Sequence, residues 1–406
     1  MGWNSWDCYG TSVTEAEVLA NAEFMARRLL PYGWDTVVVD IQWHDPTARA
    51  GGYNENAPLS LDGYGRPYPS SERFPSGFSS LAERIHGLGL RFGLHIMRGI
   101  PRLAVDRELP VLNTSFTAAD VADRSSVCPW NTDNYGLDLG HPGAQAYYDS
   151  VGRLFAEWGV DFVKADDMLW PYHEREISAF AAGLRSSGRP MQLSLSPGRG
   201  LSTEHLDHLR ENATMWRISD DLWDRWEDVY EQFARLSRWA PFIRPGAWPD
   251  ADMLPLGRIG IRAERGVDRQ SRLTPDEQRT LMSLWCIARS PLMFGGDLPT
   301  SSAETIDLLT NDAVLDVLRH SHGNREVIRD YGLVVWVAEA AGSSGRFAGL
   351  FNLEDQPQRV RTPLGDLGCR DDVQVTDLWT GSPVRVEDGA LVTDLPAHGC
   401  ALLRAA

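Results

Sequence analysis

The stretch Asp161-Phe162-Val163-Lys164-Ala165-Asp166-Asp167-Met168 has the pattern of a short buried strand that ends in one cation and two carboxylates. In a parallel α/β barrel the chemistry gathers at the C-terminal ends of the strands, because the loops there can vary without disturbing the packed interior. Lys164 lies two positions before Asp166, on the same face of the strand, and its ammonium favours the ionised carboxylate. An ionised, positioned Asp can act as a nucleophile. A surface ion pair between the two residues explains the same stretch equally well, so the rest of the chain must decide.

Strands and helices alternate eight times along residues 1–324. Apolar and β-branched runs that end in Asp, Lys, Arg or His are separated by segments with helical spacing, such as the run from Val18 to Leu29. This alternation predicts an α/β fold, a (β/α)8 TIM barrel. The predicted strands cover residues 2–6, 34–43, 91–97, 160–168, 191–197, 215–221, 248–253 and 291–298. Residues 98–141 are predicted to be a long loop carrying Trp130, and such loops often build substrate subsites.

The last part of the chain has a different pattern. From about Val327, short apolar runs alternate with turns rich in Gly, Pro and Asp. This pattern predicts a second domain, an antiparallel β-sandwich over residues 325–406. Its expected strands cover residues 333–338, 346–352, 373–378, 391–394 and 399–404.

The composition limits the classes of partner. The 406 residues are 43% hydrophobic and carry a formal net charge of -17, which argues against nucleic acid or an anionic membrane surface as a partner. The 15 Trp residues suit a carbohydrate enzyme, because aromatic faces stack on the apolar face of sugar rings. The sequence shows neither a signal peptide nor an apolar run of membrane length. We therefore expect a cytoplasmic protein, or a secreted one if an N-terminal signal has been trimmed.

The five cysteines are widely scattered and show no spacing typical of a metal site or a disulfide framework. Cys8 and Cys128 both fall in regions predicted to lie at the barrel mouth. Buried free thiols are the expected state, and pairing of these two stays an open alternative.

Two carboxylate clusters at strand ends, Asp166-Asp167 and Asp220-Asp221, supply what cleavage of a glycosidic bond needs. One carboxylate attacks the anomeric carbon, and the other donates a proton to the leaving oxygen and later takes one from water. The acid must hold its proton, and a second negative charge nearby raises its pKa.

Six motifs occur in order over nearly the whole chain: Met1-Gly2-Trp3-Asn4-Ser5-Trp6, Lys164-Ala165-Asp166, Trp216-Arg217-Ile218-Ser219-Asp220-Asp221, Gly246-Ala247-Trp248-Pro249-Asp250-Ala251-Asp252-Met253, Pro291-Leu292-Met293 and Asp377-Leu378-Trp379-Thr380-Gly381. Together they resemble glycoside hydrolase family 27, the α-galactosidase family. Each motif is weak alone, and the ordered set is specific.

The resemblance implies an exo-acting, retaining hydrolase of terminal α-D-galactosyl or closely related residues, with a glycoside as its partner and neither metal nor organic cofactor. It makes Asp166 the nucleophile and Asp221 the acid/base, whose carboxyl groups should then lie about 5 to 5.5 Å apart. The other roles that it implies are sugar contacts, by stacking for Trp6 and through hydroxyl groups for Asp40, Lys164, Arg217, Asp250 and Asp252.

Three positions depart from the galactose-binding pattern of the family. Ile41 stands where a second Asp usually follows Asp40, His95 where a Tyr is common, and Ser196 where a Glu often reaches the sugar O2. A lost acceptor costs about 1 to 3 kcal/mol of discrimination when a buried hydroxyl is left unpaired. The departures therefore keep two alternatives open, a β-L-arabinopyranosidase, whose sugar lacks the C6 hydroxymethyl group, and an isomaltodextranase-type α-glucan hydrolase.

Other classes of protein share parts of this pattern. A non-catalytic carbohydrate-binding barrel would lack the nucleophile or the acid, and both are present. A different hydrolase or isomerase could bind a divalent metal through Asp40, Asp166 and His95, and a chelator would inhibit it. His95 fits a structural histidine about as well as a ligand contact. The sequence does not determine the oligomeric state.

Overall fold

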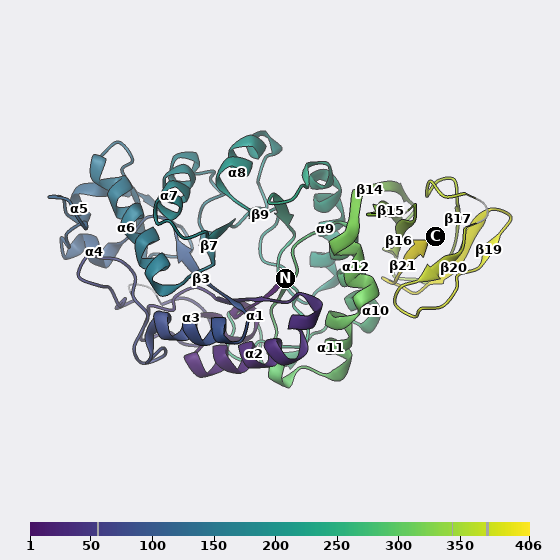
Figure 1. Ribbon diagram of the computed structural model, residues 1–406, viewed down its shortest axis with the longest axis horizontal. Coiled ribbons are helices and arrows are strands. Elements are labelled where there is room, and N and C mark those ends of the chain that lie inside the picture. The colour runs from purple at the N-terminus through teal and green to yellow at the C-terminus, as the bar shows by residue number, and fades with distance from the viewer. Residues whose placement is uncertain (55–56, 343, 371–372) are drawn as a thin grey trace. The chain divides into compact units, whose positions relative to one another are not determined.

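The computed structural model describes residues 1–54, 57–342, 344–370 and 373–406 (Figure 1). The chain forms two compact units. The first comprises Met1–Asp221, Gly257–Gln270 and Met293–Ser301, and the second comprises Leu222–Leu256, Ser271–Leu292 and Ser302–Ala406. The domain division at residue 324 stays a prediction; strand β14 (Ser321–Asp330) runs through that position.

An eight-stranded parallel sheet, in the order β10-β9-β8-β7-β3-β2-β1-β13, confirms the predicted barrel class. Its strands are β1 (Gly2–Asn4), β2 (Thr36–Val39), β3 (Arg91–Met97), β7 (Phe162–Asp166), β8 (Gln192–Leu195), β9 (Met215–Arg217), β10 (Trp248–Asp250) and β13 (Met293–Phe294). Each falls inside a predicted strand. All four residues of β2 are buried, as expected for a strand covered on both faces.

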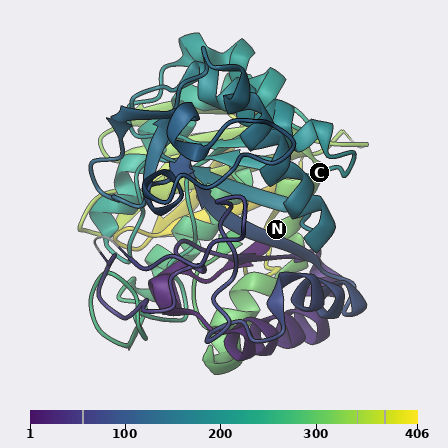
Figure 2. The ribbon, with the colours of Figure 1, turned by 90° about the vertical axis from the view of Figure 1, so that its left-hand side faces the viewer.

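The helices of the first unit follow their strands along the chain. They are α1 (Trp6–Tyr9), α2 (Glu15–Arg28), α3 (Gly77–Gly87), α4 (Arg102–Asp106), α5 (Ala118–Val121), α6 (Pro142–Trp158), α7 (Glu174–Ser186) and α8 (Leu206–Asn212). A capping box starts α2, in which Thr14 accepts from the Glu17 backbone N–H and the Glu17 side chain binds the Thr14 backbone. Helices α2 and α3 lie side by side (Figures 1 and 2).

The prediction of an unbroken loop over residues 98–141 is wrong. Besides α4 and α5, the segment contains an antiparallel sheet of β4 (Ile100–Pro101), β5 (Ala122–Val127) and β6 (Asn134–Leu137), in the order β4-β6-β5. β4 is two residues long, and the sequence of β5 is largely polar, so neither strand gives a period-2 hydrophobic signal. A further short antiparallel pair joins β11 (Arg258–Ile259) to β12 (Arg269–Gln270).

The second unit contains the predicted β-sandwich. One sheet has five strands, β14, β15 (Leu333–Ala340), β16 (Arg346–Asn352), β21 (Cys400–Ala405) and β18 (Val375–Asp377), and the other has three, β17 (Gln358–Pro363), β20 (Ala390–Leu395) and β19 (Val386–Glu387). Buried Val and Leu side chains from both sheets, such as Leu350 and Leu391, share one core. The helices of this unit are α9 (Trp226–Trp239), α10 (Pro275–Ile287), α11 (Ala303–Thr310) and α12 (Asp312–His320).

Helices α6 and α7 approach each other closely through two glycines. A β-carbon at Gly152 would lie 2.3 Å from the carbonyl oxygen of Gly183, and one at Gly183 would lie 2.7 Å from the carbonyl oxygen of Tyr148. Both obstacles are backbone atoms, which cannot move aside as a side-chain tip can. The short distance between these helices therefore depends on the absence of a side chain.

We expect Gly152→Ala to destabilise the protein by about 1 to 3 kcal/mol, because the overpacked methyl outweighs the gain of about 0.5 to 1 kcal/mol that Ala brings to a helix interior. The urea midpoint should fall. Arg153→Ala, at an exposed position of the same helix, is the control and should leave the midpoint nearly unchanged. A Gly152→Ala variant as stable as the parent would show that the two helices separate at little cost.

Candidate active site

The sheet register brings the predicted residues of three strands together. Met97 of β3 pairs with Asp166 of β7, and His95 pairs with Lys164. Lys164 also pairs with Ser194 of β8, two residues before Ser196. Because neighbouring parallel strands align their side chains, the residues at these C-terminal ends face one region of the sheet edge.

Both carboxylate oxygens of Asp166 are hydrogen-bonded. His95 Nε2 lies 3.1 Å from Oδ2, and the backbone N–H of Asp167 donates to Oδ1 at 3.0 Å. An ionised carboxylate only accepts, so Nε2 of His95 is the donor. Burial works against ionisation, but the hydrogen bond and charge of His95, with the charge of Lys164, hold the pKa of Asp166 well below its usual range. The side chain is thus a fixed, ionised carboxylate, as a nucleophile must be.

Lys164 makes its direct ion pair with Asp40, at 2.9 Å between Nζ and Oδ2. The Lys164 side chain is only 13% exposed and that of Asp40 only 2%, so the interpretation of Lys164 as part of a surface pair is wrong. Asn4 also donates to Asp40 Oδ2, at 2.7 Å. Burial opposes the charge of Lys164, but the carboxylates of Asp40, Asp166 and Asp221 raise its pKa above the usual value.

Asp221 follows β9, and its Oδ1 lies 3.3 Å from Nη2 of Arg217. Its side chain is 41% exposed, whereas that of Arg217 is 3% exposed. The charges of Asp166 and Asp221 both help to raise the pKa of Lys164 and the pKa of Tyr53. The structure therefore brings the two predicted catalytic carboxylates into one electrostatic neighbourhood.

Three aromatic rings stand together beside this cluster. Trp6 in α1 stacks on Tyr53, with 5.7 Å between ring centroids and 15° between planes, and Tyr53 lies 5.6 Å from Trp130. Burial and the charges of Asp166, Asp221, Glu264 and Asp40 raise the pKa of Tyr53 above its usual range, so its hydroxyl stays protonated. Tyr53 was not predicted, because it lies in a Gly- and Asn-rich loop without hydrophobic periodicity.

A buried charge network lies next to Asp166. Arg98 pairs with Asp167 at 2.9 Å and with Glu176 at 2.8 Å, and Tyr148 donates to Glu176. Asp167 has a φ of 59°, in the left-handed region, and its backbone N–H is the one that binds Asp166. Arg98 was not predicted either. It is the residue directly after β3, and its partner Glu176 belongs to α7, far away in the sequence.

Three predicted residues make few contacts with this cluster. Ile41 is 2% exposed, and its backbone N–H donates to Asp40 at 2.8 Å. The hydroxyl of Ser196 is buried and has no hydrogen-bond partner among the described residues. Asp252 belongs to the second unit, where its carboxylate accepts from the Leu222 backbone N–H at 2.7 Å, and its place relative to Asp166 stays a prediction.

Known proteins resemble this chain over its whole length. A family model described as alpha galactosidase A matches residues 133–320, and a model of the alpha galactosidase C-terminal beta sandwich domain matches residues 330–405. A crystal structure of a β-L-arabinopyranosidase of glycoside hydrolase family 27 from Geobacillus stearothermophilus, in complex with arabinose, is 48% identical, with a TM-score of 0.97, and the match covers 100% of this chain and 96% of that one. This chain belongs to glycoside hydrolase family 27.

Two further relatives differ in the sugar that their names give. A Bacillus halodurans protein named as a candidate α-N-acetylgalactosaminidase is 45% identical, with a TM-score of 0.90, and the match covers 100% of this chain and 96% of that one. An α-galactosidase from Cyamopsis tetragonoloba is 24% identical over 98% of this chain and 84% of its own length. Family membership thus implies a glycosidase acting on a glycoside substrate, whereas the names disagree on the sugar.

The family 27 chain offers no metal centre among the residues that the structure describes, in which no group of three or more His, Cys, Asp or Glu side chains is arranged to hold an ion. The metal alternative used Asp40, Asp166 and His95, and it stays a prediction; the Asp40 carboxylate accepts from Lys164 and Asn4. Cys8 and Cys128 are both free and buried. Burial and the nearby Asp167 raise the pKa of Cys128 to about 12. None of the described helices is long and apolar enough to cross a membrane.

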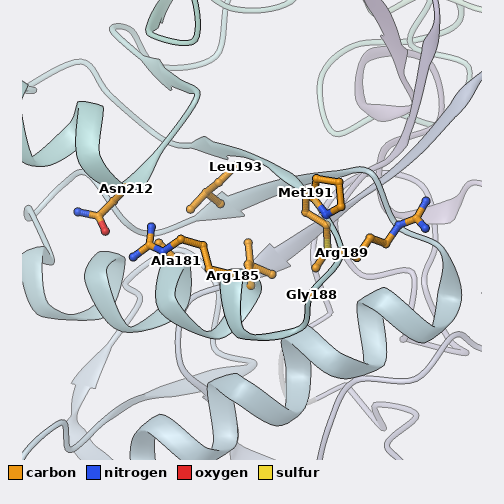
Figure 3. A pocket seen from close by; sticks show the side chains of 9 residues that line it. Ala181, Arg185, Gly188, Arg189, Met191, Leu193 and Asn212 are labelled. Atoms are coloured by element: carbon orange, nitrogen blue, oxygen red, sulfur yellow. The ribbon is translucent and has the colours of Figure 1, made fainter.

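A pocket of about 360 Å³ is lined by residues of α7 and by Met191 and Leu193, at the start of β8 (Figure 3). Arg185 and Arg189 of this pocket are charged, but Arg189 donates to the Val160 carbonyl at 2.8 Å and pairs with Asp161 at 2.5 Å. The pocket lies at the N-terminal end of the strand. In this architecture, residues at that end usually contribute to stability, and catalytic residues lie at the other end.

Replacing His95 should move the pH dependence of the glycosidase. In His95→Phe the donor to Asp166 is lost while burial remains, so the pKa of Asp166 rises and the acid limb of kcat/KM moves to higher pH. His95→Gln can still donate a hydrogen bond and should shift the limb less. A pH profile of His95→Phe with an unchanged acid limb would contradict this role.

Proposed function

We propose that the protein is an exo-acting, retaining β-L-arabinopyranosidase. β-L-Arabinopyranosides have the ring configuration of α-D-galactopyranosides without the C6 hydroxymethyl group, so the same catalytic groups serve both. The observation that carries the proposal is Ile41, which is buried beside Asp40 at the position where the galactose-binding pattern has a second carboxylate. The arabinopyranosidase relative, at 48% identity, supports the same assignment.

An apolar side chain at this position suits a ring that carries only hydrogens at C5. A hydroxymethyl group packed against Ile41 would lose its hydrogen bonds to water without gaining a partner, at a cost of about 1 to 3 kcal/mol. Asp40 is held ionised by Lys164 and also accepts from Asn4. An ionised carboxylate has about four acceptor sites, so Asp40 can still accept from the ring hydroxyls.

In the proposed reaction Asp166 attacks the anomeric carbon while Asp221 protonates the leaving oxygen, and water then releases the sugar with Asp221 as the base. The supporting geometry is the difference between the two environments. Asp166 has both oxygens hydrogen-bonded within the protein. Among the described residues Asp221 is bonded only to Arg217, at 3.3 Å, and its side chain is 41% exposed. A carboxylate that must exchange protons with water and the leaving group requires such access.

An α-galactosidase is the second candidate. The chain aligns with an α-galactosidase over 98% of its length, and Asp40, Lys164 and Arg217 occupy the positions that the family pattern assigns to galactose contacts. The two candidates differ in the ratio of activities on matched substrates. We expect p-nitrophenyl β-L-arabinopyranoside to be hydrolysed with a higher kcat/KM than p-nitrophenyl α-D-galactopyranoside, and the reverse order would favour the second candidate.

Ile41→Asp should change this preference. A carboxylate there can accept from the C6 hydroxyl, so the ratio of kcat/KM for the galactoside to that for the arabinopyranoside should rise by about 5- to 150-fold, which corresponds to 1 to 3 kcal/mol. Ile41→Val keeps the site apolar and is the matched control. If both variants change the ratio equally, packing rather than hydrogen bonding sets the preference.

Asp166→Asn should abolish turnover while the protein stays folded, as circular dichroism would show. The carboxamide is nearly isosteric but is a poor nucleophile. Asp221→Asn should lose activity on poor leaving groups far more than on a good one such as 2,4-dinitrophenol, because a good leaving group needs little protonation. Full hydrolysis by Asp166→Asn would refute the assignment of roles.

A further inference from the structure

Trp170 is unusually exposed for a large apolar side chain, at 64%. It lies on the loop that follows β7, four residues after the nucleophile Asp166. Fully buried Trp side chains are common in this protein, so its exposure at this loop stands out. Exposed aromatic rings beside a catalytic centre are common ligand contacts.

The loop that carries Trp170 is held in place on both sides. The Met168 backbone N–H donates to the Ser196 carbonyl at 3.0 Å, and that of His173 donates to the Met168 carbonyl at 3.0 Å. Tyr172 stacks on His205, with 3.6 Å between ring centroids, and its hydroxyl lies 2.5 Å from His208 Nδ1. The backbone on either side of Trp170 is therefore fixed, and a ring presented in this way loses little conformational entropy on binding.

Trp170 packs against the neighbouring loop, after β8. A β-carbon at Gly200 would lie 2.8 Å from Cε3 of the indole, so the ring lies directly on this glycine. The preceding residue, Arg199, has its Nη1 4.0 Å from Oδ2 of Asp220, and the two side chains are 64% and 57% exposed. Such a long, solvated ion pair contributes little to stability, so both charges can bind another group.

These three side chains lie on the loops that follow β7, β8 and β9, at the sheet edge where Asp166 and Asp221 also lie. Asp220 is the residue directly before Asp221, the acid/base of the proposed function. The acid must reach the oxygen of the breaking bond, and the leaving group is attached to that oxygen. A ligand that contacts Asp220 and its ion-pair partner Arg199 is therefore placed on the leaving-group side.

We propose that Trp170, Arg199 and Asp220 form a subsite for a sugar as the leaving group. The indole packs against the apolar face of a pyranose or furanose ring, and the guanidinium and carboxylate bind its hydroxyl groups. This inference rests on the proposed glycosidase mechanism, and it identifies the substrate class as disaccharides and oligosaccharides rather than glycosides of apolar alcohols.

The test compares two substrates that share the same cleaved sugar. A β-L-arabinopyranosyl disaccharide fills the subsite, whereas β-L-arabinopyranosyl fluoride leaves it empty. Trp170→Ala should lower kcat/KM on the disaccharide by at least about tenfold, mainly through KM, because truncated Trp anchors commonly have effects of this size. Activity on the fluoride should be unchanged. Trp170→Tyr should restore most of the lost activity, and Arg199→Met should weaken the disaccharide alone.

Two controls keep the result interpretable. Tyr64→Ala removes another exposed aromatic ring, one that contacts Arg66, and should affect neither substrate. Gly200→Ala keeps the indole but forces it to move, and should lower activity on the disaccharide. Equal losses of Trp170→Ala on both substrates, or no loss on the disaccharide, would overturn the inference. If the parent enzyme cleaves α-galactosyl fluoride instead, the proposed sugar fails, and the comparison is made with melibiose.

Discussion

The buried ion pair between Lys164 and Asp40 is the interaction on which the site depends. Taking each ion out of water costs several kcal/mol, and the cost is met only when charges pair and hydrogen bonds satisfy the remaining atoms. Asn4 and the Ile41 backbone provide those bonds to Asp40. The ammonium also interacts with Asp166 and Asp221, as the raised pKa of Lys164 indicates. Without this cation, two or more carboxylates at one sheet edge would repel each other, and protonation would remove the charge of Asp166.

A second group of charges supports the first. The left-handed backbone of Asp167 costs about 1 kcal/mol for a residue other than glycine, and the contacts of Arg98 with the Asp167 carbonyl and carboxylate help to hold it. This conformation is the one in which the Asp167 N–H donates to Asp166. Arg98 in turn is fixed by Glu176, so a helix outside the sheet helps to position Asp166. The arrangement exchanges some folding stability for a preorganised carboxylate.

The sequence predicted the features that depend on local pattern. All eight parallel strands were found because short apolar runs that end in polar or charged residues alternate with helical segments. Asp166 and Asp221 were assigned as catalytic because carboxylates at strand ends repeat, and this assignment stays a prediction. The features it did not predict depend on contacts between distant residues. Tyr53 becomes a site residue only by stacking on Trp6, and Arg98 only through Glu176 of another element. Strands β4 and β5 were missed because they are too short or too polar for periodicity to be visible.

In the proposed function, the side chain at position 41 limits how selective the site can be for the cleaved sugar. On the side of the cleaved sugar, a buried polar group rejects an analogue that lacks its hydroxyl partner by factors of about 10⁴ to 10⁵, whereas an apolar wall rejects an added hydroxyl by only about 10². In the proposed function Ile41 is of the second kind. A site that prefers arabinopyranosides for this reason should therefore retain a slow activity on galactosides, which makes family names that differ in the sugar compatible with one catalytic apparatus. Stronger exclusion would need a steric clash with the hydroxymethyl group, and the size of the side chain at position 41 controls that clash.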